Sequence, residues 1–159
     1  MDRYQVLPFD LAGQHLAIAL EQVVRVLPAL HVSPLPGAPA TIRGLANVRG
    51  QLLPVVDLAR RFGWTAPPLS LWQPFVWLTG SKRELLLPVE RVEAVRDFAA
   101  ADFTAAPDPR VPSSLLRGVV RSDEGLLLIQ DVEQLLNDAD EALLTELLAD
   151  REERLDVAE

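Results

Sequence analysis

The 159-residue chain is long enough for one compact domain, or for two small lobes that share a core. Its 49% of hydrophobic residues argues for a folded globule, and the lack of cysteine excludes disulfides, thiolate metal sites and thiol nucleophiles. The net charge of −8 argues against nucleic-acid binding. The sequence has no apolar run of about 20 residues and no signal-peptide pattern, which predicts a cytoplasmic protein that does not insert into membranes.

The first part of the chain predicts short strands joined by turns. Residues 4–11 alternate as a strand, turn at Ala12-Gly13-Gln14 and resume in extended form at residues 15–20, which indicates a β-hairpin. Residues 21–27 predict a turn followed by another strand. The prolines between residues 28 and 39 remove backbone donors and therefore predict an ordered surface loop.

The next block, residues 42–58, carries the most informative motif. It contains Arg43-Gly44, the turn-prone Asn47, Arg49-Gly50 and an apolar run that stops at Asp57. The order strand, glycine-containing turn, apolar strand, aspartate predicts a second hairpin. A short helix at residues 58–62 should follow it and end at Gly63.

The second half of the chain repeats the first. Residues 72–79 and 84–89 predict another hairpin, and residues 116–132 are a weaker copy of the Arg-Gly block that reaches Asp131. Two similar halves of roughly five short strands each favour small barrels. We interpret Asp57 and Asp131 as turn or helix caps rather than as an acid/base pair.

The C-terminal tail predicts a helix over residues 141–154. Leu143, Leu144, Leu147 and Leu148 are spaced to form one apolar face, and acidic residues dominate the other face. Such a helix packs on its own domain or serves as a docking helix for a partner. Both interpretations are open from the sequence.

The residues that carry chemistry give no catalytic pattern. His15 and His31 lack a cysteine, aspartate or glutamate at ligand spacing, and the chain has no P-loop, dinucleotide fingerprint or nucleophile elbow. We therefore expect no catalytic residue, no metal and no cofactor. Trp64, Trp72 and Trp77 are expected in the core or between lobes, although one could be an exposed anchor.

Arginines beside glycines are the better candidates for binding. Arg43 and Arg49 lie next to Gly44 and Gly50, in turns from which a guanidinium can project outward and contact another protein. The alternative is that each arginine braces its own turn by bonding nearby carbonyls.

With these residues assembled, the sequence resembles the CheW-like family of chemotaxis coupling proteins from about Tyr4 to Leu136. The order and spacing of motifs in both halves carry the resemblance, namely Pro36-Gly37-Ala38-Pro39, Arg43 to Gly50, Pro54 to Leu58, Pro88 to Val92, Arg117-Gly118-Val119, and Leu127-Leu128-Ile129 leading to Asp131.

The resemblance implies an all-β fold with a C-terminal helix, in which two five-stranded SH3-like β-barrel lobes share a hydrophobic seam. A single domain is expected over residues 3–138, with lobe one at about 14–79 and lobe two at about 3–13 plus 80–138. An acidic amphipathic helix and tail should occupy residues 139–159.

The resemblance also implies an adaptor without catalysis. Such a protein bridges the cytoplasmic tips of chemoreceptors to the regulatory domain of a CheA-type histidine kinase, at membrane-associated arrays. By position, Arg49 is the best candidate for a receptor contact, with Asn47 and Gly50 shaping its turn. Arg43 and Gly44 belong to the same family surface.

Val23 and Val26 match positions expected to line a receptor- or kinase-facing surface. The family commonly has glutamate where this chain has Arg25, and a reversed charge at an interface rim changes partner choice more than fold. A divergent chemosensory array, such as one governing pilus-driven motility, is therefore open beside chemotaxis. The rival functions are a localisation scaffold that tethers a partner without regulating a kinase, and a small-molecule-binding barrel or enzyme.

Overall fold

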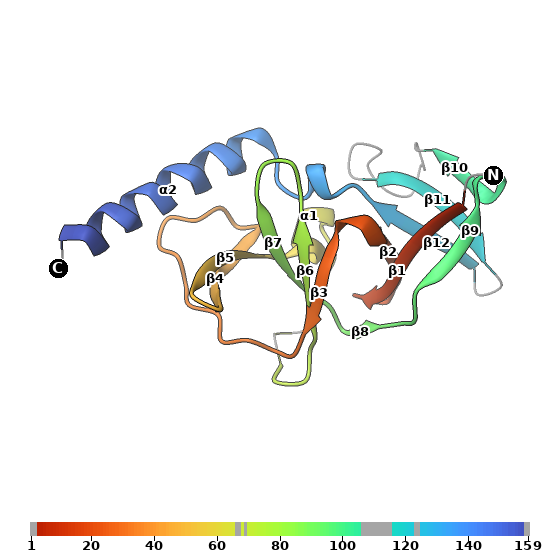
Figure 1. Ribbon diagram of the computed structural model, residues 1–159, viewed down its shortest axis with the longest axis horizontal. Coiled ribbons are helices and arrows are strands. Elements are labelled where there is room, and N and C mark those ends of the chain that lie inside the picture. Colours follow the sequence, from red (N-terminus) through yellow and green to blue (C-terminus); the bar gives the residue numbers. More distant parts are fainter. Residues whose placement is uncertain (1–2, 66–67, 69, 106–115, 123–124, 158–159) are drawn as a thin grey trace.

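The computed structural model describes residues 3–65, 68, 70–105, 116–122 and 125–157, so the proline-rich stretch noted at residues 107–112 lies outside the described part of the chain. Two β-sheets lie side by side along the long axis, and a C-terminal helix runs over one of them (Figure 1). A mostly β fold with two sheets and a C-terminal helix is what the sequence predicted.

The seven-stranded sheet combines the N-terminal hairpin with the strands of the second half. Its order is β10-β11-β12-β2-β1-β8, and β9 also pairs with β1. The strands are β1 (Arg3–Leu11), β2 (Gln14–Ala19), β8 (Arg91–Val92), β9 (Arg96–Ala99), β10 (Phe103–Ala105), β11 (Leu116–Ser122) and β12 (Gly125–Gln130). The hairpins β1–β2 and β11–β12 are antiparallel, and a parallel contact between β12 and β2 joins them.

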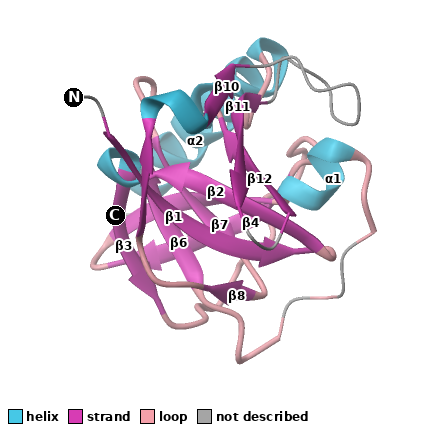
Figure 2. Cartoon of the chain, turned by 90° about the vertical axis from the view of Figure 1, so that its right-hand side faces the viewer, coloured by secondary structure: helices cyan, strands magenta, loops and turns pink. Residues whose placement is uncertain are grey.

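The five-stranded sheet is built in the same way, in the order β3-β6-β7-β5-β4. The strands are β3 (Val23–Leu27), β4 (Ile42–Val48), β5 (Gln51–Val56), β6 (Phe75–Thr79) and β7 (Glu84–Pro88). Antiparallel hairpins β4–β5 and β6–β7 meet through a parallel contact between β5 and β7. The repeat seen in the sequence therefore corresponds to a repeated pair of hairpins. Figure 2 shows the strands of both sheets from the end of the molecule that lies on the right in Figure 1.

The boundaries between the two sheets differ from the lobe boundaries expected at residues 14 and 80. Strand β2 belongs with β1, and β7 belongs with β6, so the division falls between β2 and β3 and between β7 and β8. A two-residue turn at Ala12-Gly13 keeps β1 and β2 paired from Leu11↔Gln14 onward, and strands joined so tightly stay in one sheet. One sheet also has seven strands rather than five.

The central strands are buried on both faces. One set of side chains fills a seam between the sheets, and it includes Leu7, Phe9, Leu16 and Ile18 from one sheet and Val76, Leu78, Leu85 and Leu87 from the other. Because successive side chains alternate between faces, the intervening residues Val6 and Ala17 enter a core of the seven-stranded lobe, and Phe75 and Leu86 enter a core of the five-stranded lobe. Two lobes sharing an apolar seam match the expected architecture.

Aspartate caps begin the short helices, as predicted. Asp57 precedes α1 (Leu58–Phe62) and accepts a hydrogen bond from the backbone N–H of Arg60 at 3.1 Å, and Gly63 ends this helix with φ of 77°. In the second repeat, Asp131 accepts from the N–H of Glu133 at 3.1 Å and begins the 3₁₀ turn η4 (Val132–Gln134). The capping interpretation of both aspartates is confirmed.

The first part of helix α2 (Asp138–Val157) packs on its own domain. Leu144 is fully buried in the seam and Leu148 packs against it, whereas Leu143 remains 36% exposed. At about 100° per residue the four leucines span a wide arc of the helix, and Leu143 lies at one edge of it, so the expected four-leucine face is wrong at this residue. Arg83 holds the helix from the β6–β7 turn through Glu141 and Thr145.

The C-terminal end of α2 extends past the sheets, at the opposite end of the molecule from the N-terminus (Figure 1). No helix in the described ranges has both the length and the apolar character needed to cross a membrane.

Gly44 and Gly118, the glycines that follow Arg43 and Arg117 in the two repeated blocks, each lie in a crowded β-bulge. At Gly44, with φ of 153°, an added Cβ would lie 2.2 Å from the carbonyl oxygen of Ser33, which accepts a hydrogen bond from the N–H of Leu45 at 2.8 Å. At Gly118, an added Cβ would lie 2.3 Å from the ring of Phe103. The repeated glycine is therefore required for close approach of another segment.

We expect Gly44→Ala to lower the free energy of unfolding by about 2–3 kcal/mol, because the backbone at Ser33 would have to move. The measurement is urea unfolding followed by tryptophan fluorescence. Gly13→Ala is the matched control, since Gly13 also has positive φ but has no atom within 4 Å of an added Cβ, and it should lose only about 1 kcal/mol. Equal losses in both variants would contradict the close-approach explanation.

Candidate functional site

The β4–β5 turn presents Arg49 at a rigid tip. Arg49 and Gly50 form the two-residue loop with φ of 54° and 87°, the combination that defines a type I′ turn. The side-chain oxygen of Asn47 accepts a hydrogen bond from the N–H of Gly50 at 2.7 Å and fixes the loop. The Arg49 side chain is exposed and makes no hydrogen bond or ion pair with any residue in the described ranges. Its donors are therefore available for another molecule.

Arg43 and Gly44 lie at the other end of β4 and shape the hairpin. The Nη2 atom of Arg43 is 3.4 Å from Oδ2 of Asp57, the same carboxylate that caps α1, and both side chains are half-buried. Gly44 is buried beneath Ser33. The geometry supports the bracing interpretation for Arg43, whereas the receptor contact expected from the family pattern stays a prediction.

Strand β3, which carries Val23, Arg25 and Val26, contains a bulge. The ladder to β6 passes from Val23↔Leu78 to Arg25↔Trp77 and skips Val24. Val24 and Val26 are 43% and 39% exposed, while Val23 packs against the seam. Sequence analysis did not single out Val24, because nothing in the local pattern marks the residue at which the ladder slips.

The two groups of predicted residues do not meet in one site. Strand β3 is one edge of the five-stranded sheet and β4 is the other, with β6, β7 and β5 between them. The segment after β3 returns toward β4, where Ser33 and Leu45 form an isolated bridge. The candidates therefore define two surfaces, the Arg49 turn and the β3 edge.

A groove of about 640 Å³ lies next to the start of β3. Its lining comes from β1, the end of β2, β11 and the 3₁₀ turn η1 (Leu20–Gln22), and it includes Tyr4 and Leu20. An ion pair between Arg117 Nη1 and Glu21 Oε1, 3.7 Å apart, lies at the groove. Arg117 belongs to the second Arg-Gly motif, which is the one sequence signal that could have pointed to this groove.

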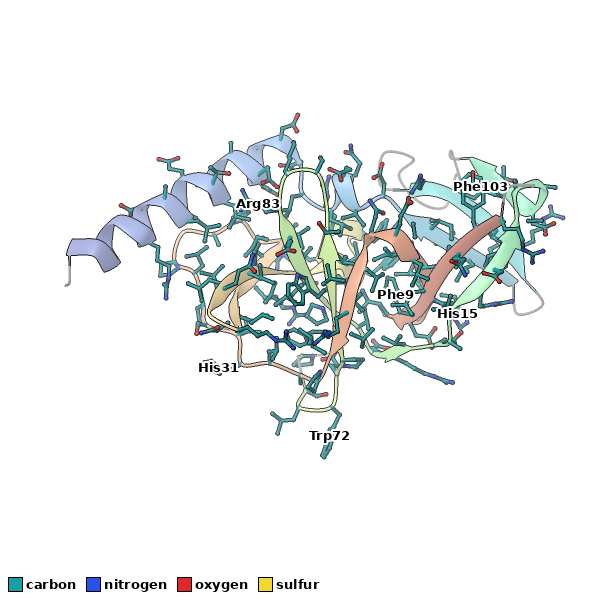
Figure 3. The ribbon with its side chains drawn as sticks, viewed as in Figure 1. Phe9, His15, His31, Trp72, Arg83 and Phe103 are labelled. Atoms are coloured by element: carbon teal, nitrogen blue, oxygen red, sulfur yellow. The ribbon has the colours of Figure 1, made fainter. Side chains whose placement is uncertain are left out.

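The tryptophans divide between core and surface. Trp64 stacks on Phe62 with ring centroids 4.4 Å apart, and Trp77 packs against the core of the five-stranded lobe. Trp72 is 90% exposed and projects from the loop before β6 (Figure 3). One exposed tryptophan was the alternative that the sequence left open.

Comparison with known proteins matches residues 5–140 to the family described as CheW-like domain. The chain is 24% identical over 142 residues to the protein named "Chemotaxis protein CheW" of Treponema pallidum, covering 86% of this chain and 84% of that protein. It is 25% identical over 140 residues to the protein of the same name in Thermotoga maritima, covering 87% and 91%.

Two further comparisons concern a solved structure and a partial sequence match. The crystal structure of scaffolding protein TtCheW from Thermoanaerobacter tengcongensis matches with a TM-score of 0.80 at 20% identity, covering 88% of this chain and 92% of that chain. This likeness shows a common fold. A stretch of 61 residues is 36% identical to "Protein PilI" of Pseudomonas aeruginosa, covering 38% of this chain and 34% of that protein.

Arg43 and Arg49 should respond differently to truncation. We expect Arg43→Ala to lower the free energy of unfolding by about 1 kcal/mol, because it removes a partly buried ion pair and leaves Asp57 without its cation. Arg49→Ala should stay within about 0.5 kcal/mol of the parent, since it removes no contact in the described structure. Urea unfolding measures both, and a loss at Arg49 equal to that at Arg43 would show that Arg49 also braces the fold.

Proposed function

The chain belongs to the CheW-like domain family, and from this premise we propose that it is a non-catalytic adaptor. It couples the cytoplasmic tips of chemoreceptors to the regulatory domain of a CheA-type histidine kinase. The protein works in the cytoplasm, at membrane-associated arrays, and without a nucleic-acid partner.

The observation that carries the proposal is the exposed Arg49, whose side chain has no partner among the described residues, on a turn fixed by Asn47 and Gly50. A guanidinium offers five donors in a planar fork, which suits the carboxylates and exposed carbonyls of a receptor helix tip. A turn that is already rigid loses little conformational entropy on binding. Arg49 is therefore the proposed receptor contact, with Arg43 and Gly44 holding the hairpin that presents it.

The β3 edge supplies the second interface. Val24 and Val26 expose apolar surface there, and β3 has a strand neighbour on only one side among the described strands. Exposed apolar side chains beside unpaired backbone groups suit a protein partner. Because β3 and β4 are opposite edges of one sheet, receptor and kinase can occupy the two surfaces at the same time.

The proposed mechanism is mechanical coupling through the five-stranded sheet. The receptor tip is held at the Arg49 turn, and movement of the tip shifts the position of the kinase domain relative to the array. Such coupling requires that the partners make different contacts in the two signalling states, since a ligand shifts an equilibrium only by its difference in affinity.

Arg25 bears on which array the adaptor serves. Its side chain is exposed on β3, where it changes the charge that an approaching partner meets. A divergent array, such as one that governs pilus-driven motility, is therefore the alternative to chemotaxis. In either pathway the adaptor role is the same.

Arg49→Glu should weaken binding of a receptor signalling fragment at least ten-fold, equal to about 1.4 kcal/mol, because the reversed charge repels the acidic groups that Arg49 would bind. The assay is co-elution with the receptor fragment and with the regulatory domain of a CheA-type kinase from the same genome, followed by kinase autophosphorylation. Arg121→Glu, at an exposed arginine of the seven-stranded sheet, is the charge-matched control and should bind normally.

The outcomes separate the proposed functions. Unchanged receptor binding by Arg49→Glu, with unchanged melting, would remove Arg49 from the interface. A ternary complex that raises autophosphorylation supports the adaptor. Kinase binding without activation would favour the localisation scaffold, and no binding to either partner would remove the proposed function while leaving the fold intact.

Truncating α2 tests the localisation scaffold directly. Deletion of all residues after Asn137 would remove Leu144 from the seam and unfold the protein, so a stop codon after Arg151 is the suitable change. The shortened adaptor should support kinase activation within about two-fold of the full chain. If the shortened protein activates the kinase normally but no longer binds a partner or no longer reaches its position in the cell, the end of α2 serves to tether that partner.

A further inference from the structure

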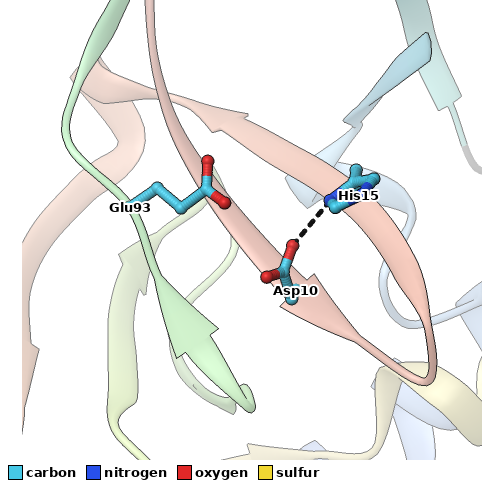
Figure 4. Close-up of side chains that lie close together, drawn as sticks. All are labelled: Asp10, His15 and Glu93. Carbon is cyan, nitrogen blue, oxygen red and sulfur yellow. Dashed lines mark hydrogen bonds and ion pairs between the residues drawn. The ribbon is translucent and has the colours of Figure 1, made fainter. Parts of the chain in front are cut away.

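Three potential metal ligands gather on the seven-stranded sheet, whereas both proposed partner surfaces lie on the five-stranded sheet. Asp10 on β1 and His15 on β2 are direct cross-strand partners. Glu93 follows β8, which pairs with β1, and its N–H donates to the carbonyl of Pro8 at 2.9 Å. Pro8 and Asp10 are two residues apart on one strand, so the register turns all three side chains to the same face (Figure 4).

The separations within this cluster suit a single ion. One potential ligand atom from each residue lies within 4.8 Å of the others, and His15 Nδ1 is 2.7 Å from Asp10 Oδ1. Two ligands at about 2.0–2.2 Å from a tetrahedral zinc are roughly 3.3–3.5 Å apart. Adjustments of about an ångström in the side chains would therefore bring the three atoms onto one ion.

The surroundings also favour a cation. Glu93 makes no side-chain hydrogen bond or ion pair with any described residue, so its carboxylate is available to a cation. Arg96 lines the same hollow, yet its guanidinium lies over the Phe98 ring, 5.1 Å from the centroid. The hollow encloses about 10 Å³, close to the room for one water-sized particle. His15 is about half exposed, which leaves a path from solvent.

We propose that Asp10, His15 and Glu93 bind one Zn²⁺ ion. An imidazole nitrogen with two carboxylate oxygens suits zinc, whereas Mg²⁺ and Ca²⁺ prefer ligand sets made only of oxygen. Water completes the tetrahedron on the exposed side. The bound ion links β1, β2 and the segment between β8 and β9, and so stabilises one end of the seven-stranded sheet.

The test is titration of the untagged full-length chain with ZnCl₂ by isothermal calorimetry, after treatment with EDTA and desalting. We expect one ion per chain with a dissociation constant of about 10 μM or tighter, and a higher melting temperature in excess zinc. MgCl₂ should bind at least 100-fold more weakly, which separates the site from general attraction of cations to the chain's net charge of −8.

The chain offers a matched pair of variants, because His15 and His31 are its two histidines. His15→Ala should weaken zinc binding at least 100-fold and abolish the rise in melting temperature, while His31→Ala, at an exposed loop position, should match the parent. Glu93→Gln preserves side-chain shape and should weaken binding at least ten-fold.

Circular dichroism and melting without zinc confirm that each variant is folded. Zinc binding weaker than millimolar, parental binding by His15→Ala, or an equal loss in His31→Ala would overturn the proposal. None of these measurements involves receptor or kinase, so the zinc site and the adaptor function stand or fall separately.

Discussion

The apolar seam between the two sheets is the contact on which the rest of the structure depends. Each lobe has a core of its own, but those cores consist of only a few buried side chains, and lobes of this size are marginal alone. The larger cluster draws on both sheets and also receives Leu58 of α1, Val132 of η4 and Leu144 of α2. The two lobes and the elements α1, η4 and α2 are therefore stabilised together.

Burial of both faces restricts where the protein can meet a partner. The Leu85-Leu86-Leu87 run of β7 is buried throughout, as are residues 6–9 of β1 and Phe75, Val76 and Leu78 of β6, so these parts of the strands present no side chains to a protein partner. What remains outside are turns and sheet edges. The proposed adaptor surfaces, the Arg49 turn and the edge strand β3, are of these two kinds, and each is held in place by strands that the seam fixes.

Sequence reasoning succeeded where the determinant is local. An aspartate before an apolar turn predicted the cap at Asp57, and Gly63 predicted the end of the same short helix. The repeated Arg-Gly blocks predicted matching hairpins. The structure explains why Gly44 and Gly118 are glycines, because a Cβ at either position would clash with a neighbouring segment.

The failures of sequence reasoning involve pairing between distant segments. The lobe boundaries required knowing that β2 stays with β1, and the exposure of Val24 depends on a slip in the ladder to β6. The candidate metal cluster was invisible because Glu93 reaches His15 only through the pairing of β8 with β1. No spacing rule along one chain contains that information.

Strand β1 links the proposed zinc site to the seam. Asp10 points to the metal cluster, while its neighbours Phe9 and Leu11 enter the seam from the opposite face of the strand. An ion that orders β1 therefore acts on residues that pack against the five-stranded lobe, although no ligand belongs to that lobe. Zinc would influence the partner surfaces only if its affinity differed between two packings of the seam, and the same free-energy difference would then make partner binding alter zinc affinity. Without such a difference, the ion adds stability to the adaptor and leaves its partner surfaces unchanged.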